Sequence, residues 1–321
     1  MTPTALLFAG QGTQYVGMGR VLHARFPEAR AVFEAADAAL GFDLTRLIFE
    51  GPESTLTQTE NTQPAVLTVA CAAWAVLRAR GFRPTVVAGH SLGEYGALVA
   101  AEVLDLADAV RLTRLRGQAM QRAVAEGVGA MAAVQRVDEA VVEAACADAD
   151  GVCDVAAYNA PGLVVLSGEA TTVHTVSARL EAEGALVTPL AVSAPFHSRM
   201  LAPAAVELEA ALSAVQMRTA TLDYVANVDA SWLVAAAPDA VRARLVAQVV
   251  GAVRWRQSLE QMLERGIDRF WHLGPGRSNL THVKRLARRA QVASFDEASD
   301  LDGLLRALDA SDSPSQAEEK P

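Results

Sequence analysis

The chain has 321 residues, of which 51% are hydrophobic and 20% are charged, so it can bury one large core or a main core with a smaller satellite. Its formal net charge of -9 excludes broad nucleic-acid binding, which needs a basic field to neutralise phosphates. The N-terminus lacks the positive charge of a signal peptide, and the longest apolar stretch, residues 65–77, is too short to span a bilayer. We therefore expect a cytoplasmic protein without a membrane anchor. The three cysteines lack metal-binding spacing, so no metal site is expected.

The first part of the chain predicts strands that alternate with helices. Apolar runs predict buried strands at residues 5–8 and 85–88, and helices are predicted at residues 64–81 and 95–101. The first of these helices is expected to begin at Pro64, which suits a first helical turn and follows a capping residue. Ser91 therefore lies at a turn between a strand and a helix.

Residues 128–193 have a different organisation. Extended segments and helices follow one another in the order β-α-β-β-α-β, at residues 131–134, 138–148, 152–158, 163–166, 171–183 and 186–192. This order is typical of a ferredoxin-like arrangement. We interpret residues 128–193 as a small domain inserted into a larger α/β body, which is formed by residues 1–127 and 194–308.

The larger body is predicted to resume after the insertion with a helix from residue 204, a strand at residues 222–225, a helix near residues 258–264 and a strand at residues 269–272. Residues 309–321 are polar and unpatterned, and they are expected to form a disordered tail. The predicted fold class is therefore α/β, with a second, smaller unit within the chain.

Residues 89–93 carry the sequence Gly-His-Ser-Leu-Gly. The pattern Gly-x-Ser-x-Gly on a sharp strand-to-helix turn lifts the serine hydroxyl out of the backbone, which predicts that Ser91 is a nucleophile. The helix that follows offers backbone N–H groups, notably that of Leu92, to an oxyanion. The same pentapeptide also occurs in ordinary loops, so the flanking strand and helix are what favour the catalytic interpretation.

A serine nucleophile needs a base, and the chain has six histidines: His23, His90, His174, His197, His272 and His282. Four of them have a simpler interpretation, because two lie in predicted surface helices, one ends an apolar strand and one belongs to a basic segment. His90 is adjacent to Ser91 and is expected to face the pocket wall. His197 lies in the loop that leaves the inserted domain and re-enters the body, which suits a base beside a cleft. From the residues alone, a structural role for His197 is the alternative.

Eight short motifs occur along the chain: Gly10-Gln11-Gly12-Thr13-Gln14, Gln63-Pro64-Ala65, Gly89-His90-Ser91-Leu92-Gly93-Glu94, Arg116-Gly117, Gly129-Ala130-Met131, Tyr158-Asn159-Ala160-Pro161, Phe196-His197-Ser198 and Gly274-Pro275-Gly276. In this order and combination they resemble the motifs of the malonyl-CoA:acyl-carrier-protein transacylase family, across about residues 5 to 290. That family has an α/β-hydrolase-like body with an inserted ferredoxin-like domain, so the resemblance implies this fold.

The resemblance implies roles for several residues. Ser91 is the expected nucleophile, and His197 is the expected base that activates first Ser91 and later the thiol of the accepting pantetheine. The backbone N–H groups of Gln11 and Leu92 are expected to form the oxyanion hole. Arg116 is expected to pair with the free carboxylate of a malonyl-type substrate, for which its planar fork is better suited than lysine. Without the family resemblance, Arg116 is one of three arginines on one predicted helix, with Arg111 and Arg114, and residue type alone cannot choose among them.

The resemblance also implies that a backbone carbonyl near Arg254 orients His197. Gln63, His90 and Asn159 are expected to line the pocket, although the residues alone allow Gln63 simply to cap a helix and Asn159 to make a turn. The loop with Phe196 before His197 resembles that of malonyl-preferring family members, where a bulky ring fills the space that a branched extender unit needs. The chain departs from the usual pattern at Ala9, Thr13 and Ala252 and by one additional residue before Leu280.

The implied activity is that of an S-malonyltransferase, which moves a malonyl or malonyl-type group from coenzyme A, through an acyl-serine, to the phosphopantetheine thiol of an acyl carrier protein in fatty-acid or polyketide synthesis. It implies no metal or bound cofactor, and we expect a monomer. The alternatives are an editing acyl-thioester hydrolase, a transacylase for a non-malonyl group and a silent docking subunit. The basic residues from Arg277 to Arg289, with Arg254 and Arg256, form either a solvated face or a docking site for the acidic carrier protein.

Overall fold

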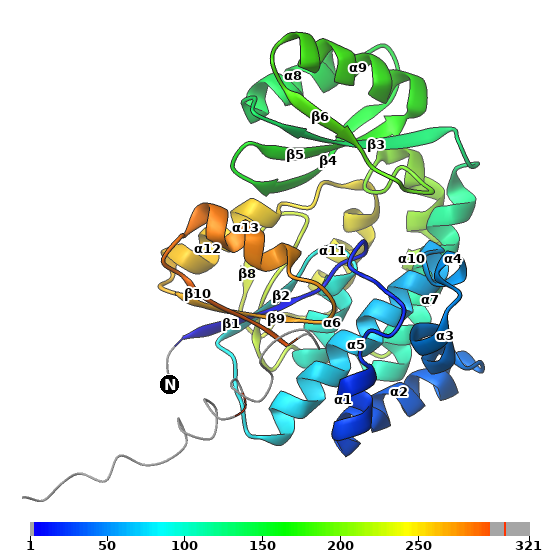
Figure 1. Cartoon of the computed structure of the whole chain (residues 1–321), viewed down its shortest axis with the longest axis vertical. Helices are drawn as coiled ribbons and strands as arrows, with labels where there is room; N and C mark the ends of the chain where they lie inside the picture. Colours follow the sequence, from blue (N-terminus) through cyan, green and yellow to red (C-terminus); the bar gives the residue numbers. More distant parts are fainter. Residues whose placement is uncertain (1–2, 296–304, 306–321) are drawn as a thin grey trace, which may run out of the picture.

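We describe the protein from a computed structural model, which describes residues 3–295 and Leu305. The chain forms a mixed α/β structure with two sheets, and the smaller sheet lies at one end of the larger body (Figure 1). The tail predicted at residues 309–321, and almost all of the predicted body beyond residue 295, lie outside the described residues.

The larger sheet positions the loops that carry the candidate site. Its strands, in the part of the chain that the structure describes, have the order β10-β9-β1-β2-β7-β8, and every neighbouring pair is parallel except β7 with β8. The strands are β1 (Thr4–Phe8), β2 (Val86–Gly89), β7 (Asp223–Val225), β8 (Trp232–Leu233), β9 (Arg269–Leu273) and β10 (Gln291–Phe295). Every residue of β1 and β2 is buried, so both faces of the sheet are covered at its centre. The loops after the parallel strands meet at one edge.

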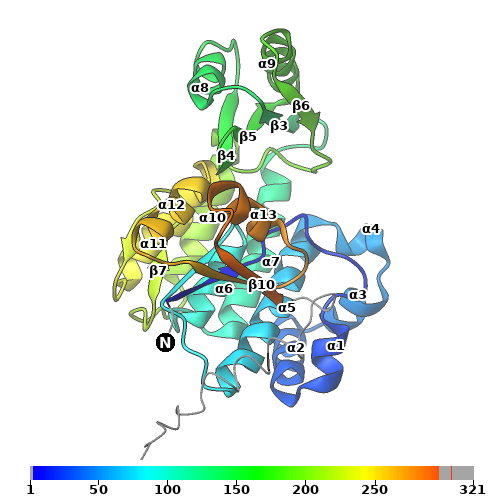
Figure 2. The same ribbon diagram turned by 60° about the vertical axis from the view of Figure 1, so that its left-hand side comes forward.

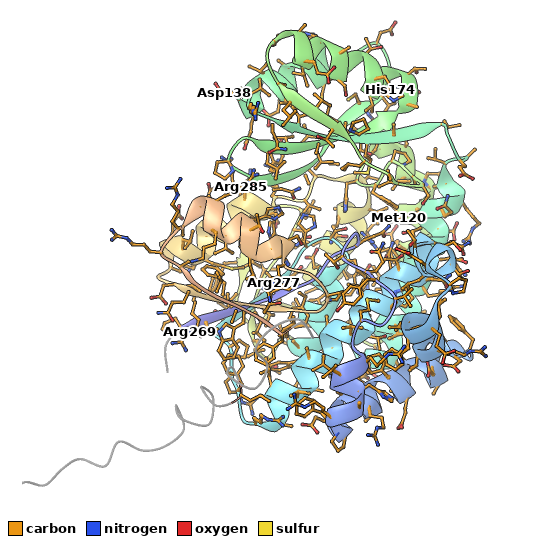
Figure 3. The ribbon with its side chains drawn as sticks, viewed as in Figure 1. Met120, Asp138, His174, Arg269, Arg277 and Arg285 are labelled. Atoms are coloured by element: carbon orange, nitrogen blue, oxygen red, sulfur yellow. The ribbon has the colours of Figure 1, made fainter. Side chains whose placement is uncertain are left out.

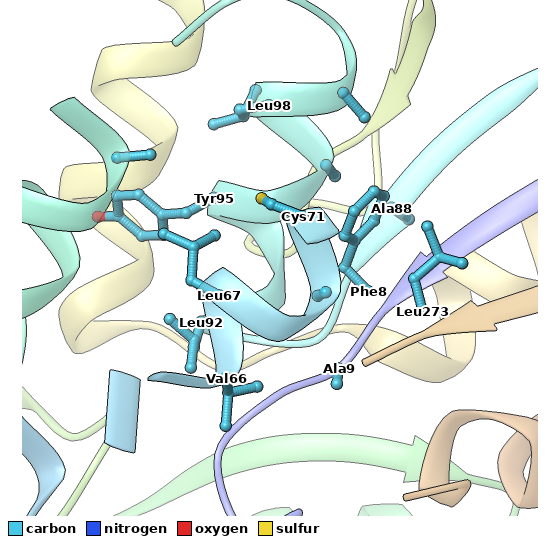
Figure 4. Packing of buried hydrophobic residues seen from close by; sticks show 14 of the residues in the cluster. Phe8, Ala9, Val66, Leu67, Cys71, Ala88, Leu92, Tyr95, Leu98 and Leu273 are labelled. Carbon is cyan, nitrogen blue, oxygen red and sulfur yellow. The ribbon is translucent and has the colours of Figure 1, made fainter. Parts of the chain in front are cut away.

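Helices cover this sheet, and the predicted elements of the body are present (Figure 1). They are α1 (Arg20–Arg25), α2 (Pro27–Leu40), α3 (Leu44–Glu50), α4 (Glu53–Leu56), α5 (Thr59–Ala79), α6 (Gly93–Ala100), α7 (Leu106–Ala123), α10 (Ala202–Ser213), α11 (Pro238–Val250), α12 (Trp255–Glu264) and α13 (Ser278–Leu286), with a short 3-10 turn at Arg199–Leu201. Figure 4 shows Leu92 and Tyr95 at the start of α6 beside Leu67 of α5, with Phe8 and Leu273 from the sheet nearby. This packing fixes α6 against the sheet.

Helix α5 differs from its prediction at the N-terminus. It begins at Thr59, so Pro64 lies inside the helix rather than in its first turn. Pro64 has no N–H to donate to the carbonyl of Glu60, and Arg114 Nη1 donates to that carbonyl instead, at 3.1 Å. With this replacement the helix tolerates the proline. At 21 residues α5 is long and apolar enough to cross a membrane, but 83% of its apolar window is buried inside the structure, as in a core helix.

The smaller sheet is antiparallel and has the strand order β4-β5-β3-β6. Its elements follow the predicted β-α-β-β-α-β order: β3 (Gly129–Gln135), α8 (Glu139–Ala147), β4 (Cys153–Ala160), β5 (Leu163–Glu169), α9 (Ala170–Ala182) and β6 (Leu186–Pro189). The two helices pack on one face of the sheet and enclose a separate small core. Figure 2 shows this unit projecting from the larger body.

The two parts of the chain are joined at the edge strand β4. The backbone N–H of Tyr158 donates to the carbonyl of Val253 at 2.9 Å, and the N–H of Val253 donates to the carbonyl of Ala156 at 2.9 Å. The body thereby continues the small sheet by one bridge and holds β4 in register. Strand β6 ends at Pro189, earlier than predicted. The N–H of Leu190 still donates to the carbonyl of Met131 in β3 at 3.0 Å, but residues 191–193 leave the sheet and line a cavity at the junction.

Candidate active site

Ser91 occupies the turn between β2 and α6. Its φ of 51° lies in the left-handed region, which a non-glycine residue enters only where the surrounding structure imposes it. The chain is very close-packed here: a Cβ on Gly89 would lie 2.0 Å from the carbonyl carbon of Gly93, and a Cβ on Gly93 would lie 2.4 Å from the carbonyl oxygen of Phe8. Glycine is therefore required on both sides of the turn that presents the Ser91 hydroxyl at the edge of the sheet.

His197 reaches Ser91 from the segment that returns from the small sheet. Its Nε2 lies 2.7 Å from Ser91 Oγ, at hydrogen-bond distance. The φ of His197 is 59°, so this residue is also held in the left-handed region. Asp154 of β4 fixes the residues that follow, because its carboxylate accepts from Ser198 Oγ at 2.8 Å and from the N–H of Arg199 at 2.9 Å. The fold thus brings together the predicted nucleophile and the predicted base.

The carbonyl that orients His197 is that of Gln248, and the prediction of Arg254 is wrong. His197 Nδ1 lies 2.8 Å from Gln248 O. Gln248 is in the last turn of α11, where carbonyl groups have no partner within the helix and are free to accept. The carbonyl of Arg254 instead accepts from the N–H of Ser258 at 2.9 Å, because it lies at the start of α12 and closes its first turn.

The environment of His197 keeps its imidazole neutral. Burial, with a smaller contribution from the positive charge of Arg116, lowers the pKa of His197 to about 3, although the hydrogen bond to the Gln248 carbonyl acts in the opposite direction. A carbonyl only accepts, so the ring proton of neutral His197 is on Nδ1. The lone pair on Nε2 therefore faces Ser91 Oγ, which is the arrangement that a general base needs.

Arg116 lies on α7, only 3% exposed, with its guanidinium group beside Ser91. Its Nη1 donates to Gln63 Oε1 at 2.8 Å, and its Nη2 donates to Gln248 Oε1 at 3.0 Å and to Ser91 Oγ at 3.2 Å. All of these acceptors are neutral, and Arg116 Nε has no hydrogen-bond partner among the described residues. A buried cation without a bonded anion is costly, so the site is suited to receive an anionic group.

The loop after β1 brings Gln11 to the same site. Gln11 and Ser91 line one cavity, and Gln11 Oε1 accepts from Thr59 Oγ1 at 2.7 Å, which ties the loop to α5. Within residues 3–295, the backbone N–H groups of Gln11 and Leu92 donate to no other group. Leu92 precedes the first turn of α6, so its N–H is one of the unpaired donors of a helix N-terminus. Two free donors beside a nucleophile are what an oxyanion hole requires.

A cavity of about 640 Å³ opens in front of Ser91, and both parts of the chain form its wall. His90 and Asn159 lie on this wall and contact each other, with His90 Nε2 2.7 Å from Asn159 Oδ1. Phe196 is also part of the lining, as predicted for a residue that limits the space for the acyl group. Gln63 is not: it is fully buried and holds the guanidinium group of Arg116 instead.

Three polar side chains at the site were given no role by the sequence: Glu94, Asn227 and Gln248. Asn227 follows β7 and fixes the Ser91 turn, since its Oδ1 accepts from the N–H of Ser91 at 2.6 Å and its Nδ2 donates to the carbonyl of Gly89 at 2.7 Å. Its place after a parallel strand was the one available signal. No group of three or more His, Cys, Asp or Glu side chains is placed to hold a metal ion within the described part of the chain.

Comparison with known proteins decides the family. Residues 5–289 match the family model described as the acyl transferase domain. The chain belongs to the acyl transferase family. Among acyl transferases, the malonyl CoA-acyl carrier protein transacylase of Escherichia coli (strain K12) is 40% identical to it, over 95% of this chain and 99% of that protein. The enzyme of the same name from Bacillus subtilis (strain 168) is 36% identical, over 96% of this chain and 98% of that protein.

Solved acyl transferase structures match the fold along nearly its whole length. The acyl-carrier-protein-S-malonyltransferase from Bartonella henselae has a TM-score of 0.92 and 39% identity, and the match covers 96% of this chain and 100% of that one. A malonyl-transacylase solved in complex with a type II PKS acyl-carrier protein has a TM-score of 0.91 and 36% identity, with 96% and 100% covered.

Proposed function

We propose that this acyltransferase moves a malonyl group from coenzyme A to the phosphopantetheine thiol of an acyl carrier protein, through an ester on Ser91. The observation that carries the assignment is the buried guanidinium group of Arg116, which lies 3.2 Å from Ser91 Oγ and is bonded only to neutral oxygens. The relatives named above, which match along almost the whole chain, are malonyl CoA-acyl carrier protein transacylases.

The geometry supports a two-step transfer. In the first step, Ser91 Oγ gives its proton to His197 Nε2 and attacks the thioester carbonyl, while the N–H groups of Gln11 and Leu92 stabilise the oxyanion. The C–S bond then breaks, and coenzyme A leaves as a thiol with the proton from His197. In the second step, His197 takes the proton of the pantetheine thiol, the sulfur attacks the ester carbonyl, and Ser91 leaves with that proton.

The substrate carboxylate is expected to bind Arg116. A charge-assisted contact to a buried guanidinium group is stronger than one between neutral groups, and the carboxylate supplies the directly hydrogen-bonded anion that Arg116 lacks. An editing hydrolase for neutral acyl chains gains nothing from such a cation and bears its desolvation cost. Phe196, with Met131 of β3, narrows the cavity near the acyl group, which favours malonyl over branched extenders.

One assay separates transfer from the alternatives. We would incubate the protein with malonyl-CoA, acetyl-CoA and holo acyl carrier protein and follow the masses of enzyme and carrier. Malonyl on Ser91 and then on the carrier supports malonyl transfer, whereas free acid alone indicates a hydrolase. Acetyl loading at an equal rate indicates a different acyl group, and no loading indicates a silent subunit.

We infer an α/β-hydrolase-like body with an inserted ferredoxin-like domain, supported by the Ser91 turn and by the strand order β4-β5-β3-β6. The domain limits at residues 128 and 193, the cytoplasmic location and the monomeric state stay predictions. Size-exclusion chromatography with light scattering tests the last of these.

The low pKa of His197 gives a prediction for the pH dependence of Ser91 loading. Because His197 loses its proton at about pH 3 rather than 6.5, it stays a base as the pH falls from 8 to about 5. The rate of single-turnover loading should therefore not fall with a midpoint at pH 6.5. Burial raises the pKa of Glu94 to about 7. A fall in the loading rate with a midpoint near pH 7 therefore belongs to Glu94 if it is absent in Glu94→Gln. A fall in the loading rate with a midpoint near pH 6.5 that persists in Glu94→Gln contradicts the prediction for His197.

The carrier protein is expected to dock on the exposed basic residues of α13 and of the segment after it. Figure 3 labels Arg277, which precedes α13, and Arg285, which lies near the end of α13 and close to the small sheet. Lys284 is partly committed to structure, because its Nζ donates to the carbonyl groups of Arg288 and Ala290 at 3.1 and 2.7 Å. Arg256 is already paired with Glu139 at 3.0 Å.

Arg285 also has a partner, since its Nη2 donates to Gln135 Oε1 of β3 at 3.3 Å. Replacing the exposed Arg288 and Arg289 with glutamate therefore tests docking without removing these contacts. At low salt, we expect kcat/KM for the carrier protein to fall by about tenfold or more, because like charges then face an acidic partner, while loading from malonyl-CoA is unchanged. Replacing Arg30 and Arg46, two exposed arginines of α2 and α3, with glutamate changes the net charge by the same amount and is the control. Transfer at the wild-type rate would remove the docking proposal.

A further inference from the structure

The carboxylate of Glu94 lies among the polar groups that support Ser91. Glu94 is in the first turn of α6 and is 0% exposed. Its Oε1 accepts from the hydroxyl of Tyr224 and from the N–H of Asn227 at 3.2 Å, and its Oε2 accepts from the side-chain amide of Gln248. A buried carboxylate is tolerated only where donors reach its oxygens, and both oxygens have donors here. The proposed chemistry gives this anion no direct part.

Gln248, which Glu94 holds, contacts all three groups at the reacting centre. Its backbone carbonyl accepts from His197 Nδ1 at 2.8 Å. Its side-chain Oε1 accepts from Arg116 Nη2 at 3.0 Å, and its Nε2 donates to the carbonyl of Ser91 at 3.0 Å. A displacement of Gln248 therefore moves the base, the cation and the nucleophile together.

The charge of Glu94 matches the way in which the amide of Gln248 points. An ionised carboxylate only accepts hydrogen bonds, so Gln248 presents its NH₂ group to Glu94. Its Oε1 then faces Arg116, which only donates. The amide thus lies between a buried anion on one side and a buried cation on the other, and the Ser91 carbonyl accepts from the same NH₂ group, so a donor in place of the Glu94 oxygen would conflict with this arrangement.

We propose that Glu94 is a positioning residue for malonyl transfer, which acts through Gln248 to hold Arg116 in place for the substrate carboxylate and His197 in place for Ser91. The inference rests on the proposed function, because the role of Arg116 there is to bind a carboxylate. It adds a determinant of substrate preference that does not touch the substrate.

The substitution Glu94→Gln preserves the size of the side chain, removes its negative charge and replaces one acceptor oxygen with a donor. Tyr224 and Asn227 both donate toward Oε1, so the single oxygen of the new amide stays there and its NH₂ group faces Gln248. In its present orientation the NH₂ group of Gln248 then meets the new NH₂ group, and in the flipped orientation it meets Arg116 while its oxygen meets the carbonyl of Ser91. Since neither orientation satisfies every partner, Gln248 must shift, and the guanidinium group that it holds loses its place beside Ser91.

The test measures kcat and KM for transfer to the carrier protein with malonyl-CoA or acetyl-CoA as the donor, together with the melting temperature. For Glu94→Gln we expect kcat/KM for malonyl-CoA to fall by about tenfold or more, chiefly through KM, because a charge-assisted contact is misplaced. Loading from acetyl-CoA, which has no free carboxylate, should fall much less. The ratio of the two is the readout that a purely structural role would not change.

Two further variants keep the inference open to contradiction. Tyr224→Phe removes one donor from Glu94 but leaves the contact to Gln248, so it is expected to lower the melting temperature and keep the malonyl preference. If Glu94→Gln does not fold, Gln248→Met keeps the backbone carbonyl for His197 and removes the amide, and it should show the same loss of preference. Wild-type preference in a folded Glu94→Gln or Gln248→Met would overturn the inference. Failure of the wild type to load malonyl would instead reject the proposed function.

Discussion

Replacing Ser91 with alanine is expected to abolish malonyl loading and to lower kcat/KM for transfer by about 1000-fold or more. The variant keeps the cavity, His197 and the two free N–H groups, but it has no hydroxyl oxygen that can form the ester with the acyl group. Intact mass after incubation with malonyl-CoA checks this directly, since the wild type should gain one malonyl group and Ser91→Ala none.

The control for this experiment is Ser213→Ala. Ser213 is an exposed serine at the end of α10, whose hydroxyl donates only to the carbonyl of Glu209. This variant should load malonyl at the wild-type rate. If Ser91→Ala still gained a malonyl group, the ester would lie on another residue and the proposed intermediate would be wrong.

Replacing Arg116 with alanine should give the second largest loss. Removal of a buried, charge-assisted contact to the substrate carboxylate costs about 3 kcal/mol, which is roughly a 100-fold fall in kcat/KM for malonyl-CoA. Acetyl-CoA makes no use of the guanidinium group, so its loading should fall less or even rise. The measurement is the ratio of the two specificity constants, which should shift toward acetyl.

Two other arginines of α7 show that the effect is specific to position. Arg111 pairs with Asp108 at 2.8 Å with its side chain 54% exposed, and Arg114 pairs with Glu60 at 3.4 Å. Arg111→Ala removes a cation from the same helix without touching the cavity, and it should leave malonyl loading unchanged. Equal malonyl preference in Arg116→Ala and wild type would show that the carboxylate binds elsewhere.

Short-range patterns in the sequence predicted the secondary structure around the site well. The run at residues 5–8 and the run at residues 85–88 became β1 and β2, because continuous apolar segments of this length suit strands that are covered on both faces. The alternation between residues 129 and 189 gave the order of elements in the small sheet. Helix α5 was mispredicted at its start, since the partner that compensates for Pro64 comes from Arg114 on a different helix.

Contacts between distant residues were beyond local patterns. The sequence could not choose among Arg111, Arg114 and Arg116 of α7 without the family resemblance, yet burial separates them at once, because only Arg116 is almost completely covered. The choice of Gln248 over Arg254 depends on where α11 ends relative to the ring of His197. Neither relationship has a short-range signature.

By itself, the sequence determined that Ser91 lies on a glycine-flanked turn, since the spacing of Gly89 and Gly93 is a local property of the backbone. Family motifs added His197 as its expected base. Only the tertiary structure decided that the two side chains meet, that Gln248 orients the ring, and that Glu94 supports both Gln248 and the Ser91 turn. The reason is physical: hydrogen bonds and burial depend on distances between segments far apart in the chain, which packing sets.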